Sequence, residues 1–137
     1  VGCTFTTKLP VTLITGDLAF FYDRNAFWHN YSMANLRIIL LNNHAGGIFR
    51  LIEGPAKQPE LQEYFETKQK LNAKCLANEF GFTYFSAKNE VELDSALKDF
   101  YDSGVHPKIL EIESQSPLNA EILKSIKEKV KTILPSA

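Results

Sequence analysis

The feature that most constrains the fold is a series of four short runs that predict strands, three of them apolar, separated by stretches with helical spacing. They cover residues 11–15, 36–41, 82–85 and 108–113, and the first is rich in β-branched residues. Short, continuously apolar runs are typical of buried parallel strands, which helices cover on both faces. We therefore predict an α/β fold, a three-layer sandwich around a mainly parallel sheet.

Helices are predicted between and after these runs, over residues 18–31, 59–65, 69–80, 93–101 and 117–133. The first is apolar on nearly all sides, so we expect it to be buried on nearly all sides. Asn89 with Glu92 predicts a capping box, and Ser116 as N-cap with Pro117 predicts the start of the last helix. The lysines of that helix alternate with glutamates, which predicts a solvated face.

Composition limits the classes of partner and compartment. The 137 residues predict one domain, and the net charge of -1 gives no reason to expect nucleic acid or an anionic membrane. No apolar run is long enough for a membrane span, and Cys3 and Cys75 lack metal-ligand spacing, which favours free thiols in a cytoplasmic protein. Because the chain starts at Val1 without Met, we interpret residues 1–9 as the remnant of an upstream helix and loop of a longer protein.

Polar residues stand where the first two predicted strands end. Gly16-Asp17 follows the first strand and Asn42-Asn43 the second, with Asp17 and Asn43 26 residues apart. One strand-helix-strand unit spans that distance, so Asp17 and Asn43 can converge at the carboxyl edge of the sheet, where such sheets bind ligands. A helix N-terminus after Gly16 suits a phosphate group.

The residue types at this edge are those of a metal-diphosphate site. A carboxylate, a carboxamide and a backbone carbonyl offer the hard oxygen ligands that magnesium or calcium takes. Gly46 and Gly47 let the chain turn so that the Ala45 carbonyl faces the same ion. In the alternative interpretation Asp17 is only a helix cap and Asn42-Asn43 only a turn.

These motifs resemble a known signature: Gly-Asp-x, about two dozen residues, then Asn-Asn is the pattern of thiamin diphosphate enzymes. More narrowly, the chain resembles the 2-succinyl-5-enolpyruvyl-6-hydroxy-3-cyclohexene-1-carboxylate synthases of menaquinone biosynthesis. The segments that carry this resemblance are Gly16-Asp17-Leu18, Phe21-Tyr22-Asp23 with Asn25, Leu40-Leu41-Asn42-Asn43 and Gly46-Gly47-Ile48-Phe49.

The resemblance implies the thiamin diphosphate-binding fold, here its C-terminal diphosphate-binding domain over residues 1–137, truncated at the N-terminus. It implies that magnesium (or manganese) is ligated by Asp17, Asn43 and the Ala45 carbonyl. The cofactor-binding residues it implies are Gly16, Asp17, Leu18, Ala19, Asn43 and Ile48, and Ile48 and Phe49 line the substrate pocket. The implied reaction decarboxylates 2-oxoglutarate and adds the succinic semialdehyde unit to isochorismate.

The same resemblance implies that this chain is inactive alone. The glutamate that activates the cofactor is expected upstream, on the N-terminal pyrimidine-binding domain of a second subunit of a homodimer or homotetramer. Glutamates 53, 60 and 63 are predicted to be surface residues, and His44 and Arg50 are either loop residues or substrate contacts. Ala45 departs from the family, which has glycine there, so the turn must accept a Cβ.

Two alternatives stay open. One is a domain of another thiamin diphosphate enzyme, such as an acetohydroxyacid synthase-like protein. Three features of the chain distinguish it from that relative: Leu18, the Tyr-Asp-x-Asn segment and the Gly-Gly-Ile-Phe segment. The other is a non-catalytic, flavodoxin-like domain for ligand binding or interaction.

Overall fold

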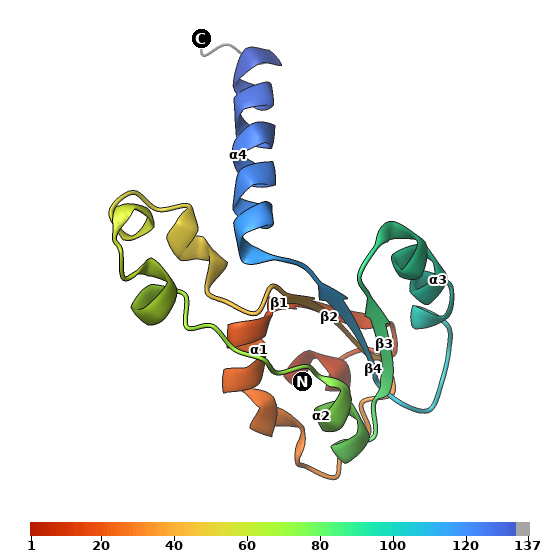
Figure 1. The fold of residues 1–137 in the computed structure, drawn as a ribbon. Coiled ribbons are helices and arrows are strands. Elements are labelled where there is room, and N and C mark those ends of the chain that lie inside the picture. The colour runs from red at the N-terminus through yellow and green to blue at the C-terminus, as the bar shows by residue number, and fades with distance from the viewer. Residues whose placement is uncertain (134–137) are drawn as a thin grey trace. The chain divides into compact units, whose positions relative to one another are not determined.

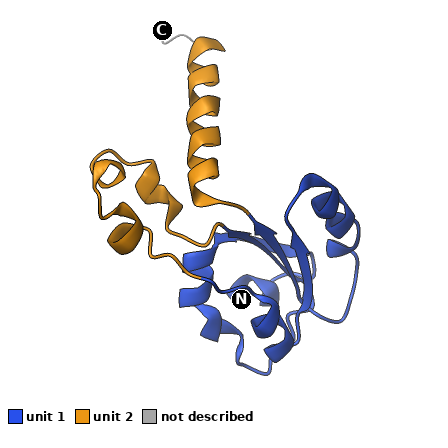
Figure 2. Cartoon of the chain, in the orientation of Figure 1, with its two compact units in different colours: residues 1–42, 70–113 blue, residues 43–69, 114–137 orange. Residues whose placement is uncertain are grey.

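A computed structural model describes residues 1–133 of the chain. The chain divides into two compact units (Figure 2). The first consists of Val1–Asn42 and Lys70–Glu113, and the second of Asn43–Gln69 and Ser114–Ala137. The first unit holds the sheet, and the second holds the long loop after the second strand together with the last helix.

The sheet of the first unit has four parallel strands in the order β1-β2-β4-β3. Their bounds are β1 Val11–Gly16, β2 Leu36–Asn42, β3 Thr83–Ala87 and β4 Lys108–Glu113. The predicted parallel sheet is therefore confirmed. β3 begins one residue later than predicted and ends two residues later.

Helices cover both faces of this sheet (Figure 1). Helices α1 (Asp17–Tyr22) and α2 (Lys74–Glu79) contribute to one buried cluster, and helix α3 (Glu90–Phe100) contributes to another. Ile38 and Leu40 belong to the first cluster, while Ile39 packs against the second. Because successive side chains of a strand point to opposite faces, this alternation confirms the predicted three-layer sandwich.

The helix predicted over residues 18–31 is wrong in length. α1 ends at Tyr22, because Asp23 leaves the helical region (φ -101°, ψ 14°), and a 3-10 turn, Arg24–Phe27, follows. The expected burial on nearly all sides is also wrong. Two phenylalanines, Phe20 and Phe27, enter the core, while the side chains of three other aromatic residues are mostly exposed: Tyr22, Trp28 and Tyr31.

The helix predicted over residues 69–80 is likewise shorter. Leu71 stays outside α2 because its carbonyl accepts a hydrogen bond from Asn42 Nδ2 (3.0 Å). Ala73 precedes the helix, and its N–H donates a hydrogen bond to the side chain of Glu111 in β4. Gly81 ends this segment as predicted, with a positive φ of 71° that favours glycine.

The predicted capping box at the start of α3 is confirmed. Asn89 Oδ1 accepts the Glu92 N–H (2.9 Å), and Glu92 reaches back to accept the Lys88 N–H (2.9 Å). The first bond satisfies a backbone donor that a helix start leaves without an intrahelical partner, and the second binds the N–H of the residue before the N-cap.

The second unit contains 3-10 turns at Gly47–Arg50 and Pro55–Lys57, a π-helical turn at Leu61–Phe65, and helix α4, Ser116–Ile133. The lysines of α4 are exposed, as predicted. Apolar residues of α4 are also 48% exposed or more, at Leu118, Ile122, Ile126, Val130 and Ile133. Within residues 1–133, no helix is long and apolar enough to span a bilayer.

Candidate functional site

The ends of β1 and β2 lie side by side in the first unit. The two strands are parallel, and Gly16 is opposite Leu41 in the register. Gly16 is extended (φ -84°, ψ 162°), and Asp17 follows it as the first residue of α1, with only 3% of its surface exposed. The predicted convergence of the two strand ends at one edge of the sheet is therefore present.

Asn42 at the end of β2 is held by a buried carboxylate. Glu111 of β4 is fully buried, and its Oε1 accepts a hydrogen bond from Asn42 Nδ2 (2.6 Å). Its Oε2 accepts bonds from the Ala73 N–H (2.9 Å) and the Tyr84 hydroxyl (2.6 Å). Burial raises the pKa of Tyr84, and the hydrogen bond and charge of Glu111 raise it further.

The sequence analysis did not identify Glu111 as part of this edge. The signal was a charged residue in the middle of a predicted strand, between Leu110 and Ile112. A carboxylate there needs several donors, because an unpaired buried charge is costly.

The second unit begins with Asn43, whose side chain closes a turn. Asn43 Oδ1 accepts the Ala45 N–H (3.1 Å), and the Gly47 N–H donates to the Ala45 carbonyl (2.9 Å). Gly46, between them, has φ -74° and ψ 70°, the geometry of an inverse γ-turn. The chain therefore bends back at Gly46, as predicted.

Gly47 is required for space rather than for an unusual φ. A Cβ at this position would lie 2.6 Å from Asn43 Nδ2 and 3.4 Å from Ser116 Oγ. The side chain of Asn43 therefore lies directly against Gly47. Only glycine at this position leaves room for the Asn43 amide where the structure places it.

The departure at Ala45 is accommodated without a strained backbone. Ala45 is 4% exposed and is not among the residues with positive φ. The left-handed conformation falls instead on His44, with φ 58°. A left-handed residue that is not glycine is uncommon and marks this turn as tightly determined.

Arg50 is not a freely solvated arginine, because it is paired with a buried carboxylate. Its Nε and Nη2 donate to the two oxygens of Glu66, at 2.6 and 2.7 Å. Glu66 is fully buried and also accepts the Ser116 hydroxyl (2.7 Å), while its carbonyl accepts the Gly46 N–H (2.5 Å). Glu66 thus joins the turn, Arg50 and the start of α4, and the sequence analysis missed it.

Burial raises the pKa of Glu66, but the hydrogen bonds from Arg50 and Ser116 outweigh burial. Together with the charges of Arg50 and Lys68 they hold the pKa of this carboxyl below its ordinary value. Glu66 is therefore an anion that stabilises the unit. Glutamates 53, 60 and 63 are exposed, as predicted.

The two residues predicted to face substrate differ in exposure. Ile48 is 61% exposed, and Phe49 is half-buried, with its ring 5.7 Å from the ring of Phe65. Phe49 therefore has a fixed packing partner within the unit, while Ile48 is available to a ligand.

The residue types predicted to hold the magnesium ion are chemically suited to it. The predicted set combines the carboxylate of Asp17, the amide oxygen of Asn43 and the carbonyl of Ala45, all hard oxygen ligands. The described residues contain no group of three or more His, Cys, Asp and Glu side chains placed to hold a metal ion. Because Asp17 belongs to the first unit and the other two ligands to the second, their convergence on one ion stays a prediction.

Comparison with known families identifies the class of protein. Residues 1–112 match the family described as thiamine pyrophosphate enzyme, C-terminal TPP binding domain. The chain belongs to this family, whose cofactor, thiamine pyrophosphate, is thiamin diphosphate. The resemblance to thiamin diphosphate enzymes is confirmed.

The narrower resemblance is confirmed by individual relatives, each named 2-succinyl-5-enolpyruvyl-6-hydroxy-3-cyclohexene-1-carboxylate synthase. The chain is 54% identical to the protein of Cytophaga hutchinsonii over 94% of its own length. It is 46% identical to that of Christiangramia forsetii over 90%, and 40% identical to that of Flavobacterium johnsoniae over 90%. These alignments span 23%, 21% and 22% of the relatives.

Proposed function

We propose that this chain is the diphosphate- and magnesium-binding domain of a synthase that depends on thiamin diphosphate. The synthase decarboxylates 2-oxoglutarate and adds the succinic semialdehyde unit to isochorismate, in menaquinone biosynthesis. The observation that carries the proposal is the pair of adjacent strand ends, with Asp17 after β1 and Asn42-Asn43 at the end of β2. Identity of 54% to a synthase of this name supports the choice among thiamin diphosphate enzymes.

The roles of the residues follow from their chemistry. Asp17, Asn43 and the Ala45 carbonyl hold the magnesium (or manganese) ion, which neutralises charge on the diphosphate. Backbone groups at Gly16, Leu18 and Ala19 bind the diphosphate itself.

Ile48 and Phe49 form the apolar wall of the substrate pocket. When bound, thiamin diphosphate supplies the chemistry of breaking and forming the carbon–carbon bonds. The chain holds and orients that cofactor and keeps water away from it.

This domain does not work alone in the proposal. The glutamate that activates the cofactor comes from the pyrimidine-binding domain of a second subunit, in a cytoplasmic homodimer or homotetramer. Residues 1–137 form the C-terminal domain of each subunit, residues 1–9 being the end of an upstream helix and loop, and are inactive by themselves.

The test is turnover by the intact protein that carries this chain. We expect product from 2-oxoglutarate with isochorismate only when thiamin diphosphate and magnesium are both present. Condensation of two pyruvate molecules instead would favour an acetohydroxyacid synthase-like enzyme. Absence of any binding of thiamin diphosphate by the intact protein would refute the proposal.

A further inference from the structure

Two buried cations stand side by side at the amino-terminal edge of the sheet, opposite the edge that carries Asp17. Arg37 of β2 is 2% exposed and Lys108 of β4 is 7% exposed. The two residues are partners in the β2–β4 register, so their side chains leave the same face of the sheet. Like charges placed directly opposite each other on neighbouring strands destabilise a sheet.

No carboxylate within residues 1–133 pairs with either cation. Lys108 Nζ donates to the carbonyls of Asp99 (2.5 Å) and Asp102 (2.9 Å). Arg37 Nη2 donates to the same Asp102 carbonyl (2.9 Å). The two aspartates thus bind the cations through their backbone carbonyls, and their carboxylates do not form ion pairs with them.

The guanidinium of Arg37 retains donors without an acceptor. Nη1 donates to the carbonyls of Ala34 (2.8 Å) and Leu36 (2.9 Å), and Nη2 to that of Asp102. Nε is buried and has no hydrogen-bond partner. Of the five N–H groups of the guanidinium, Nε–H and one on Nη2 therefore remain. Burial lowers the pKa of Arg37, and the electrostatic interaction with Tyr101 offsets this only in part.

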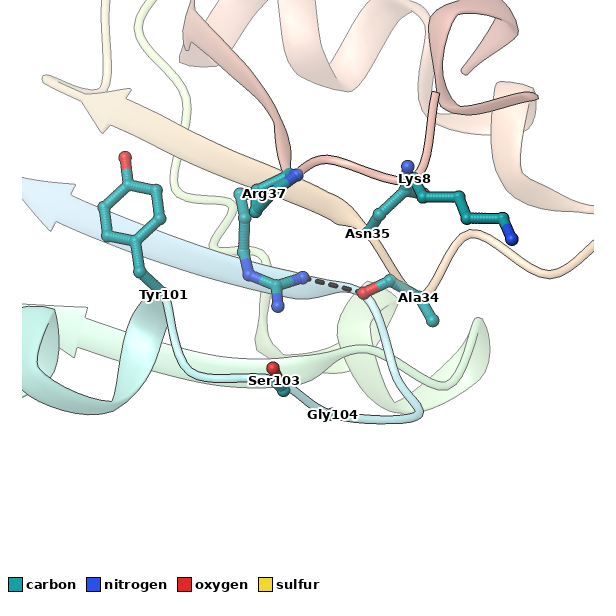
Figure 3. Close-up of a pocket in the computed structure, with 8 residues that line it drawn as sticks. Lys8, Ala34, Asn35, Arg37, Tyr101, Ser103 and Gly104 are labelled. Atoms are coloured by element: carbon teal, nitrogen blue, oxygen red, sulfur yellow. Dashed lines mark hydrogen bonds between the residues drawn. The ribbon is translucent and has the colours of Figure 1, made fainter. Parts of the chain in front are cut away.

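Arg37 lines a pocket of about 250 Å³ in the first unit. In Figure 3 the guanidinium lies between Tyr101 and Ala34, and the Ser103 hydroxyl points toward it. Lys8 stands at the rim with its ammonium turned outward. The segment that carries Lys8 is fixed by Asn35, whose Nδ2 donates to the carbonyls of Thr7 (2.9 Å) and Leu9 (3.1 Å).

The second buried cation, Lys108, lies behind Gly104 in the wall of the pocket. A Cβ on Gly104, which lines the pocket, would lie 3.7 Å from Lys108 Cε. The pocket is smaller than the roughly 300–1,000 Å³ typical of sites for drug-sized ligands. It therefore suits a small ion.

From this arrangement we propose that the pocket at the amino-terminal edge binds a small oxyanion, a phosphate or carboxylate group, through Arg37 and Ser103, while the exposed Lys8 at the rim adds positive charge. The remaining N–H of Arg37 Nη2 and the Ser103 hydroxyl can each donate to an oxygen of such a group, and the permanent charge of the guanidinium favours an anion there. The bound anion supplies the negative charge that Arg37 and Lys108 lack. This site is independent of the diphosphate site at the other edge.

Titration of the intact protein that carries this chain, isotope-labelled at serine and glycine and followed by the amide resonances of Ser103 and Gly104, tests the proposal. Inorganic phosphate and succinate are added separately, each against sodium chloride at equal ionic strength. We expect saturable shifts with at least one oxyanion and none with chloride. A response to phosphate alone assigns a phosphate ligand, and a response to succinate alone assigns a carboxylate.

Variants locate the binding. Arg37→Gln abolishes the saturable shifts, and Lys8→Ala, at an exposed position, weakens binding by about twofold to fivefold. Lys124→Ala, an exposed lysine of α4 outside the pocket, leaves the affinity unchanged. If Arg37→Gln does not fold, Ser103→Ala takes its place and must weaken binding. Equal shifts with chloride, no saturable shift in the wild type, or unchanged affinity in Arg37→Gln (or in Ser103→Ala where Arg37→Gln does not fold) would overturn the proposal.

Discussion

Replacing Gly47 with alanine is expected to damage metal binding while leaving the fold almost as stable as before. The new Cβ would lie 2.6 Å from Asn43 Nδ2, closer than two such atoms can approach, so the Asn43 side chain must rotate away. Rotation breaks the hydrogen bond from the Ala45 N–H to Asn43 Oδ1 (3.1 Å). The amide then leaves the position from which it would reach the ion.

The two contributions to stability nearly cancel. Losing that hydrogen bond costs about 0.5–1.5 kcal/mol. Replacing glycine stabilises by about 0.4–1 kcal/mol through the unfolded chain, since Gly47 has no positive φ that alanine would strain. The net change in the free energy of unfolding is therefore at most about 1 kcal/mol. Displacing a ligand or its support typically lowers metal affinity by about 10–100-fold.

Calorimetric titration of the intact protein with magnesium, in the presence of thiamin diphosphate, measures the affinity, and urea unfolding measures the stability. Gly2→Ala is the matched control, because a Cβ at Gly2 has no atom within 4 Å. It should change neither quantity. Wild-type magnesium affinity in Gly47→Ala would refute the assignment of Asn43 as a ligand held by Gly47.

Three further predictions concern stability. Tyr84→Phe removes a 2.6 Å hydrogen bond to the buried carboxylate of Glu111 and should lower the free energy of unfolding in urea by about 1.5–3 kcal/mol. Asn89→Ala removes the N-cap of α3 and should cost about 1 kcal/mol in the same assay. The pKa of Glu66 in the folded protein lies below its ordinary value. The contribution of Glu66 to the free energy of unfolding is therefore complete above the unfolded pKa and is lost as the pH falls through the folded pKa. Melting temperatures measured against pH should show this loss in the wild type but not in Glu66→Gln.

Each of these has a clear contrary result. An unchanged unfolding midpoint in Tyr84→Phe would mean that Glu111 does not need this donor. An unchanged free energy of unfolding in Asn89→Ala would show that the N-cap does not stabilise α3. A melting temperature that falls equally on acidification in Glu66→Gln and wild type would show that another group causes the loss.

The sequence predicted the strands of the sheet well, because short apolar runs favour strands. The predicted burial of the first strand is wrong: β1 lies at the edge of the sheet, and Leu13 and Ile14 are 44% and 64% exposed.

The sequence also failed for the length of α1, where aromatic residues at mixed helical spacing suggested one long helix. Phe20 and Phe27 reach the same core from two separate segments, and Tyr22 and Trp28 stay exposed. Composition alone does not distinguish a helix buried all round from a chain that turns back on itself.

The sequence predicted the candidate site at the strand ends, but it did not predict the buried glutamates that hold these segments in place. Asp17 and Asn43 stood out because Gly-Asp and Asn-Asn are local patterns. Glu66 and Glu111 stabilise the turn and the end of β2 through partners 16 to 69 positions away in the chain. No local spacing reveals such long-range pairs, and only the fold brings them together.

The central claim is that Asp17 binds the magnesium ion that carries thiamin diphosphate. Its most direct test is calorimetric titration of the intact protein and its Asp17→Asn variant with thiamin diphosphate, with and without magnesium. Asp94→Asn, at an exposed position of α3, serves as control. We expect magnesium-dependent binding in the wild type and the control, and at least about a tenfold loss in Asp17→Asn. Equal, magnesium-independent affinity in all three proteins would contradict the account.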